Sequence, residues 1–234
     1  MCDVNDTDHS FDKNELEIIN VDSDGSCLYK CLIAYFNYYQ DIYKDNKDIA
    51  ELFNNNMTDE YYEENEDTIV FNLQKKLKNW LVEHKDDKCT IVDDMSVQDF
   101  ILMMHSDIST IEEYDKLFEI FAGDPNFINI KTNDVYKTGK NKGQPKTVKS
   151  PIPLRWGSTA ELYAFNKIYG INIIQYMTIR FDNKAKKFIP CTLKSKQYRF
   201  KPIQVIGNDD KNDNSNTIRL LSFESNRHHY QLLV

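Results

Sequence analysis

Residues 22–31, DSDGSCLYKC, mark the point at which a turn gives way to a helix. The first half of this stretch is small and acidic, which is typical of a turn, and the apolar residues 16–21 before it suit a strand. From Leu28 onward, apolar side chains recur at steps of three and four, which is the period of an amphipathic helix. The sequence therefore predicts a helix that begins at or just before Cys27, directly after an Asp-Gly turn.

A cysteine at the start of a helix lies beside unpaired N–H groups and the positive end of the helix dipole. Both favour the thiolate, which is the form that attacks an electrophile. Gly25 and Ser26 lie in the same loop, whose backbone N–H groups can turn toward an oxyanion. The competing interpretation is a buried, inert cysteine, which is what most free cysteines are. The stretch by itself does not decide between the two.

A thiol nucleophile needs a base, and the chain has five histidines. His9 lies near the start of the chain, in a polar segment. His84 and His105 follow helical stretches and are expected at the surface or at helix ends. His228 and His229 fall in the last strand, where neighbouring side chains point to opposite faces. The strand pattern therefore offers one base for a shared site without choosing between these two.

Further elements follow from the same periodicities. Helices are expected at residues 71–84, 97–104, 111–121 and 158–169, and strands at 171–177, within 178–206, at 217–223 and at 228–234. Ser158 and Glu161 have the spacing of a capping box, so Glu161 is expected to cap the helix rather than act as a catalytic acid. Residues 131–153 are basic and contain Gly and Pro, and are interpreted as a mobile, lysine-rich loop. Helices first and strands later indicate an α+β fold.

Composition limits the class of protein. The chain has 234 residues and a formal net charge of −8, which argues against nucleic acid and against an anionic membrane surface as partners. No apolar run approaches the ~20 residues of a membrane span. The start of the chain lacks the pattern of a secretory signal. We therefore expect an intracellular, cytoplasmic protein without a membrane partner.

The cysteines agree with that interpretation. They are odd in number and scattered, which does not suit a disulfide framework: Cys2, Cys27, Cys31, Cys89 and Cys191. Cys31 falls one helical turn after Cys27 and is expected to pack beneath it. A Cys-x-x-x-Cys pair with no further ligands is a poor zinc signal, so no metal is expected.

Three blocks resemble the ovarian-tumour (OTU) family of cysteine proteases. Residues 24–30, DGSCLYK, are similar to the family's cysteine block. Residues 156–162, WGSTAEL, resemble its central Trp-Gly block, which precedes a helix and then an apolar strand. Residues 229–233, HYQLL, resemble its terminal His-Tyr block. The blocks occur in the family's order and span residues 16–234, so we expect one catalytic domain after a flexible tail of residues 1–15.

The resemblance implies an OTU-like fold of the papain-like superfamily, with a small, mostly antiparallel sheet flanked by helices. It implies a deubiquitinase in which Cys27 attacks the carbonyl after the C-terminal glycine of ubiquitin and His229 is the general base. Asp24 matches a residue linked to the oxyanion loop, and Gly25 and Ser26 lie in that loop. Trp156 and Gly157 match the block beside the channel for the ubiquitin tail, although a core tryptophan is an equal alternative for Trp156. No cofactor is implied.

The chain departs from the family at the third catalytic position. The family usually places Asn or Asp two residues after the histidine, where this sequence has Gln231. Its amide oxygen can accept a hydrogen bond from the imidazole if the longer side chain folds back. The alternatives are a carboxylate from Asp22 or Asp24, or no strong orienting group and slow turnover.

The expected partner is ubiquitin or polyubiquitin, bound by a monomeric enzyme. The acidic balance suits the arginines of the ubiquitin tail. Three other functions stay open: action on another ubiquitin-like modifier, cleavage of a polyprotein, and a non-catalytic ubiquitin-binding module. The abundance of Asn, Lys, Ile, Tyr and Asp suggests an AT-rich genome, as in a virus, an intracellular bacterium or a protist. Such a source is compatible with an effector that acts in host cytoplasm.

Overall fold

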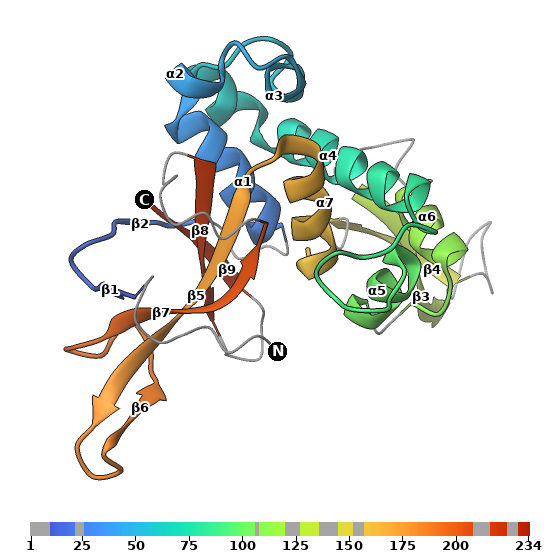
Figure 1. Cartoon of the computed structure of the whole chain (residues 1–234). Helices are drawn as coiled ribbons and strands as arrows, with labels where there is room; N and C mark the ends of the chain where they lie inside the picture. The colour runs from blue at the N-terminus through green and yellow to red at the C-terminus, as the bar shows by residue number, and fades with distance from the viewer. Residues whose placement is uncertain are drawn as a thin grey trace.

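The described part of the chain forms a curled seven-stranded sheet, a separate two-stranded sheet and a group of helices (Figure 1). The computed structural model describes residues 10–21, 26–105, 108–119, 127–135, 145–151, 157–207, 216–223 and 229–234. The helices are α1 (Cys27–Tyr38), α2 (Gln40–Tyr43), α3 (Lys47–Leu52), α4 (Asp59–Glu83), α5 (Val97–Met104), α6 (Ile111–Glu119) and α7 (Thr159–Tyr169). The strands are β1 (Phe11–Asp12), β2 (Ile18–Ile19), β3 (Phe127–Val135), β4 (Pro145–Pro151), β5 (Asn172–Asp182), β6 (Lys187–Pro190), β7 (Arg199–Ile206), β8 (Thr217–Phe223) and β9 (His229–Leu233).

The main sheet has the strand order β1-β7-β5-β8-β9-β2, and β6 pairs with the far end of β5. All of its pairs are antiparallel except β5 with β8. Helices dominate the first half of the chain and strands the second. The predicted α+β class is therefore confirmed, with a mostly antiparallel sheet.

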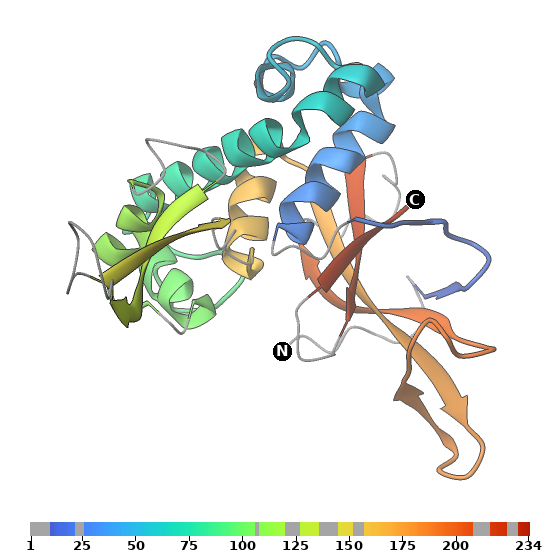
Figure 2. The same ribbon diagram turned by 180° about the vertical axis from the view of Figure 1, so that it is seen from behind.

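Helix α1 covers one face of this sheet and packs along β9, with α4 and α7 beside it (Figures 1 and 2). The largest hydrophobic cluster joins these helices to the inward side chains of the sheet, from Cys27 to Leu232. It is broad because α1 is buried along ten consecutive residues, Cys27 to Phe36, and not only along one stripe. The nucleophile candidate therefore lies inside the main core.

Local sequence signals explain where several elements begin and end. Ser158 and Glu161 form the predicted capping box at the start of α7, and Gly170 ends that helix at φ 67°, a left-handed conformation that favours glycine. Thr58 caps α4 and Ser96 caps α5, each accepting a hydrogen bond from a backbone N–H of the first turn. These helices start where a side chain satisfies otherwise unpaired N–H groups.

Several expectations differ from the structure. The helix expected at residues 71–84 begins earlier, at Asp59, where Thr58 caps it. Phe11 and Asp12, in the segment interpreted as a tail, form β1 and pair with Phe200 and Arg199 of β7. Phe11 packs on Tyr176 across the second face of the sheet, and this apolar contact favours an ordered edge strand. The segment interpreted as a lysine-rich loop, residues 131–153, includes the second half of β3 and all of β4, which form their own antiparallel pair.

The pair β3 and β4 lies beside α5 and α6, away from the seven-stranded sheet (Figures 1 and 2). The division into one catalytic domain stays a prediction. Within the described part of the chain, no helix is both long enough and apolar enough to cross a membrane.

Candidate functional site

Cys27 is the first residue of α1, as the sequence predicts. The side chain of Ser26, the N-cap residue, makes no capping hydrogen bond, and its carbonyl accepts the first helical bond from the N–H of Lys30 at 3.0 Å. The thiol is 4% exposed and lies where the N–H groups of the first turn converge. The start of the helix acts to stabilise a thiolate at this position, and burial acts against it.

His229 is the first residue of β9, the strand along which α1 packs. Figure 2 shows the beginning of α1 beside the beginning of β9. The next residue, Tyr230, joins the hydrophobic cluster of Cys27. Burial raises the pKa of Tyr230 to about 12, and electrostatic interactions with Cys27, Glu161 and Cys31 raise it further. Cys27 and His229 therefore lie at the same end of the α1–β9 pair.

The two faces of β9 differ in what they contact. Tyr230 and Leu232 face α1, whereas Leu233 belongs to the cluster on the opposite face of the sheet. By strand alternation His229 and Gln231 share the face of Leu233, opposite α1, so catalysis by His229 requires its side chain to turn around the start of β9 toward Cys27. His229 is half-buried at the strand end. His228, the competing base, lies outside the described residues.

Gln231 has a partner that the sequence analysis missed. Its Nε2 donates to Oδ1 of Asn20, in the segment that follows β2, at 2.5 Å. The contact follows from the pairing of β2 with β9, in which Ile19 lies opposite Leu232. Oε1 of Gln231 is buried and has no hydrogen-bond partner among the residues that the structure describes. The Nε2 end of the amide is thus held by Asn20, and Oε1 can still accept a hydrogen bond.

Gly157 lies against the start of α1. A Cβ atom on Gly157 would be 2.3 Å from Cδ2 of Leu28, the residue after Cys27. A side chain at position 157 would have to displace Leu28, so the central block and the cysteine block meet here. Asp24, Gly25 and Trp156, also predicted as site residues, lie outside the described part of the chain.

Cys31 is buried beneath Cys27, as predicted. Burial raises its pKa well above the usual value, and a negative charge on Cys27 raises it further. Cys31 is therefore a neutral packing thiol. The four cysteines in the described part of the chain, Cys27, Cys31, Cys89 and Cys191, are all free thiols.

A buried polar network lies beside the site. His105 is the C-cap residue of α5, at a helix end as predicted, and not at the surface, since it is 7% exposed and its Nε2 lies 2.8 Å from Oε1 of Glu161. The hydroxyl of Tyr114 donates to the same oxygen at 2.7 Å. The N–H and hydroxyl of Ser158 donate to Oε2 at 2.7 and 2.6 Å. His105 is buried because α5, α6 and α7 converge on this carboxylate, which no local pattern reveals.

The network predicts acid sensitivity. Burial acts to raise the pKa of Glu161, but the hydrogen bonds and charge of His105, with bonds from Ser158 and Tyr114, outweigh it and lower that pKa. A lowered folded-state pKa adds stability above the unfolded value, near 4.5, and this stability is lost as pH falls through the folded value. We expect Glu161→Gln to cost about 1–3 kcal/mol at neutral pH, because the amide nitrogen cannot accept from Ser158.

Urea unfolding between pH 3 and 7 measures this effect. The loss of stability below pH 4.5 should be smaller in Glu161→Gln than in the original protein, and unchanged in Glu60→Gln, which removes an exposed carboxylate of α4. Equal pH slopes in all three proteins would contradict the assignment.

His84 ends α4, as expected of a histidine after a helix. It is the C-cap residue, and its Nδ1 lies 2.8 Å from the carbonyl of Trp80. No group of three or more His, Cys, Asp or Glu side chains that could hold a metal ion occurs in the described ranges.

A scan against protein-family models found no match to this chain, and neither did a search of the curated proteins.

Proposed function

We propose that this chain is a cysteine hydrolase with an OTU-like, papain-like fold that removes ubiquitin from its conjugates. One observation carries the proposal: the helix that begins with Cys27 packs along the strand that begins with His229. The three sequence blocks that resemble the OTU family supply its substrate class. The contact between Gly157 and Leu28, which joins two of these blocks, adds support.

In the proposed reaction, His229 takes the proton of the Cys27 thiol and the thiolate attacks the carbonyl carbon after the last glycine of ubiquitin. The carbonyl oxygen becomes an oxyanion, which backbone N–H groups of the loop before α1 stabilise. The C–N bond then breaks, and His229 passes its proton to the leaving amine. Water next gives a proton to His229 and attacks the thioester. The acid is released and the Cys27 thiol is restored.

Gln231 is proposed as the positioning residue for His229. The two side chains share one face of β9, and Asn20 holds the Nε2 end of the amide. The buried Oε1 can then accept a hydrogen bond from the imidazole, which selects one tautomer and one ring orientation. Asn20 thereby supports His229 indirectly, because it fixes the amide of Gln231.

We expect Gln231→Ala to lower kcat about tenfold or more with little change in KM, well short of the ~10⁴-fold loss for a triad carboxylate. Gln231→Glu should keep more activity, because it retains an acceptor oxygen. Steady-state hydrolysis of a fluorogenic ubiquitin amide measures both, and Asn20→Ala should show part of the same loss. An unchanged kcat in Gln231→Ala would mean that another group orients the histidine.

The substrate class is tested with ubiquitin that bears a C-terminal electrophile. We expect one covalent adduct, seen as a single mass increase of one ubiquitin. Parallel probes built on other ubiquitin-like modifiers should react more slowly. Preference for one of those would reassign the modifier while leaving the thiol chemistry intact. A folded protein that reacts with no probe would contradict the proposed function and favour a binding module.

A further inference from the structure

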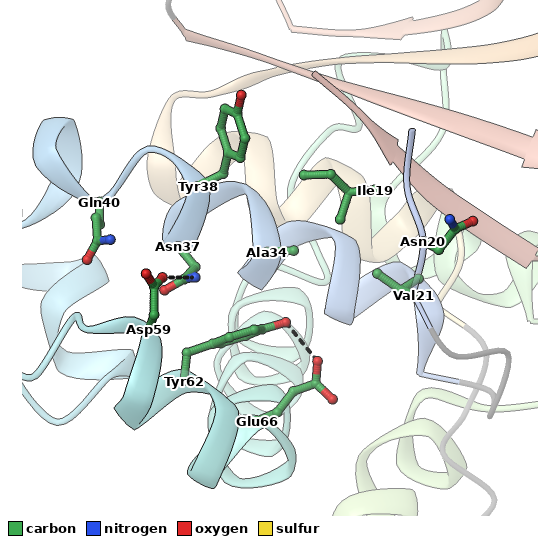
Figure 3. A pocket seen from close by; sticks show the side chains of 10 residues that line it. All are labelled: Ile19, Asn20, Val21, Ala34, Asn37, Tyr38, Gln40, Asp59, Tyr62 and Glu66. Carbon is green, nitrogen blue, oxygen red and sulfur yellow. Dashed lines mark hydrogen bonds between the residues drawn. The ribbon is translucent and has the colours of Figure 1, made fainter. Parts of the chain in front are cut away.

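A pocket of about 530 Å³ lies beside α1, between β2 and the first two turns of α4. Figure 3 shows its lining: Ile19, Asn20, Val21, Ala34, Asn37, Tyr38, Gln40, Asp59, Tyr62 and Glu66. Asn37 is ten residues after Cys27, which is about 15 Å along a helix at ~1.5 Å per residue. The polar end of the pocket is therefore remote from Cys27, while Asn20, which also bonds Gln231, lies at the other end. The volume is in the range of ligand sites.

The two ends of the pocket differ in chemistry, as Figure 3 shows. Ile19 and Val21 form an apolar end, while Asn37, Gln40 and Asp59 form a polar end. Tyr62 lies between them, and its hydroxyl donates to Oε1 of Glu66 at 2.7 Å, which holds the ring in place. A ligand that fills the pocket needs an apolar part and a polar part that lie on either side of Tyr62.

Charge decides which polar group fits. Glu66 also pairs with Lys30 at 3.0 Å, and this lysine is 4% exposed, so the carboxylate of Glu66 is already balanced. Asp59 accepts one bond from Nδ2 of Asn37 at 2.9 Å, and a carboxylate has room for more. The uncompensated charge of the pocket is therefore negative and lies at its polar end.

The free acceptor atoms of the pocket favour a ligand with several hydrogen-bond donors. Oδ1 of Asn37 is buried at the polar end and has no hydrogen-bond partner within the described part of the chain. A buried acceptor without a donor is costly, so a ligand that supplies one gains affinity. A guanidinium carries five N–H donors in a planar fork that can bridge two acceptors, and it stacks well on an aromatic ring.

We infer that this pocket binds an arginine side chain of a polypeptide partner, with a neighbouring apolar residue against Ile19 and Val21. The guanidinium lies between the Asp59 carboxylate and Oδ1 of Asn37, and the aliphatic stem crosses the ring of Tyr62. This inference does not depend on the reactivity of Cys27, and it adds a second recognition surface to the proposed enzyme.

The test uses the full chain carrying Cys27→Ala and the capped dipeptide acetyl-Val-Arg-amide, followed by NMR titration of the ¹⁵N-labelled protein. We expect saturable shifts that include the side-chain amide of Asn37. The same peptide with citrulline, a neutral isostere of arginine, should bind at least tenfold more weakly. Equal affinity for the two peptides, or no binding to the folded protein, would overturn the inference.

Variants locate the binding. Asp59→Asn should weaken the arginine peptide about tenfold, whereas Glu60→Gln, which removes the next charge on α4 outside the lining, should not. Ala34→Leu fills the pocket without changing its charge and should also abolish binding. If both Asp59→Asn and Ala34→Leu fold and still bind as the original does, the peptide binds elsewhere and the pocket assignment is wrong.

Discussion

Replacing Cys27 with alanine is expected to abolish both the covalent adduct with electrophilic ubiquitin and the hydrolysis of ubiquitin conjugates. The thiol is the only group at the start of α1 that can form the thioester. Loss of a nucleophile in a hydrolase costs about 10⁶-fold in kcat. Intact-protein mass spectrometry measures the adduct, and cleavage of di-ubiquitin measures turnover.

Cys31→Ala is the matched control for this experiment. Cys31 lies one turn further along α1, is fully buried and has a raised pKa, so its loss should leave the adduct in place. Urea unfolding of both variants separates chemistry from folding. An adduct that survives in Cys27→Ala would move the nucleophile to another cysteine.

Replacing His229 with alanine is the second change expected to abolish turnover, by about 10⁴-fold or more, whereas His228→Ala should retain it. His229 begins the strand that packs along α1, and the proposed reaction has no other base for the Cys27 thiol. Hydrolysis of a fluorogenic ubiquitin amide measures the two variants side by side.

The rate of alkylation by iodoacetamide as a function of pH tests the role directly. In the original protein the reactive thiol should titrate well below the ordinary value of about 8.5, and in His229→Ala it should titrate close to that value. Cys27→Ala identifies which thiol is measured. If His228→Ala removes activity and His229→Ala does not, the opposite neighbour is the base.

Much of the fold follows from local sequence. The capping box of Ser158 and Glu161, the stop at Gly170 and the helix that begins at Cys27 are each where neighbouring residues place them. These signals are readable because capping, left-handed glycine and helical period depend only on residues within about one turn. The α+β class follows from the order of those elements.

Long-range pairing is a different matter. The short strand at Phe11 has no strand signal of its own. It forms because its backbone pairs with β7 and the Phe11 ring packs on Tyr176. The β3–β4 pair lies where a loop was expected, and it exists because the backbones of residues 127–135 and 145–151 pair with each other. Both outcomes depend on the second strand that pairs with each segment, so the periodicity of one segment could not reveal them.

The candidate site divides along the same line. By itself the sequence determined that Cys27 opens a helix and that a histidine lies in the last strand, because both are statements about neighbours in the chain. Only the tertiary structure decided that α1 packs along β9, that Asn20 meets Gln231, and that His105 is buried on Glu161. Each of these contacts joins residues more than fifty positions apart, and only the packing of whole helices and strands selects them.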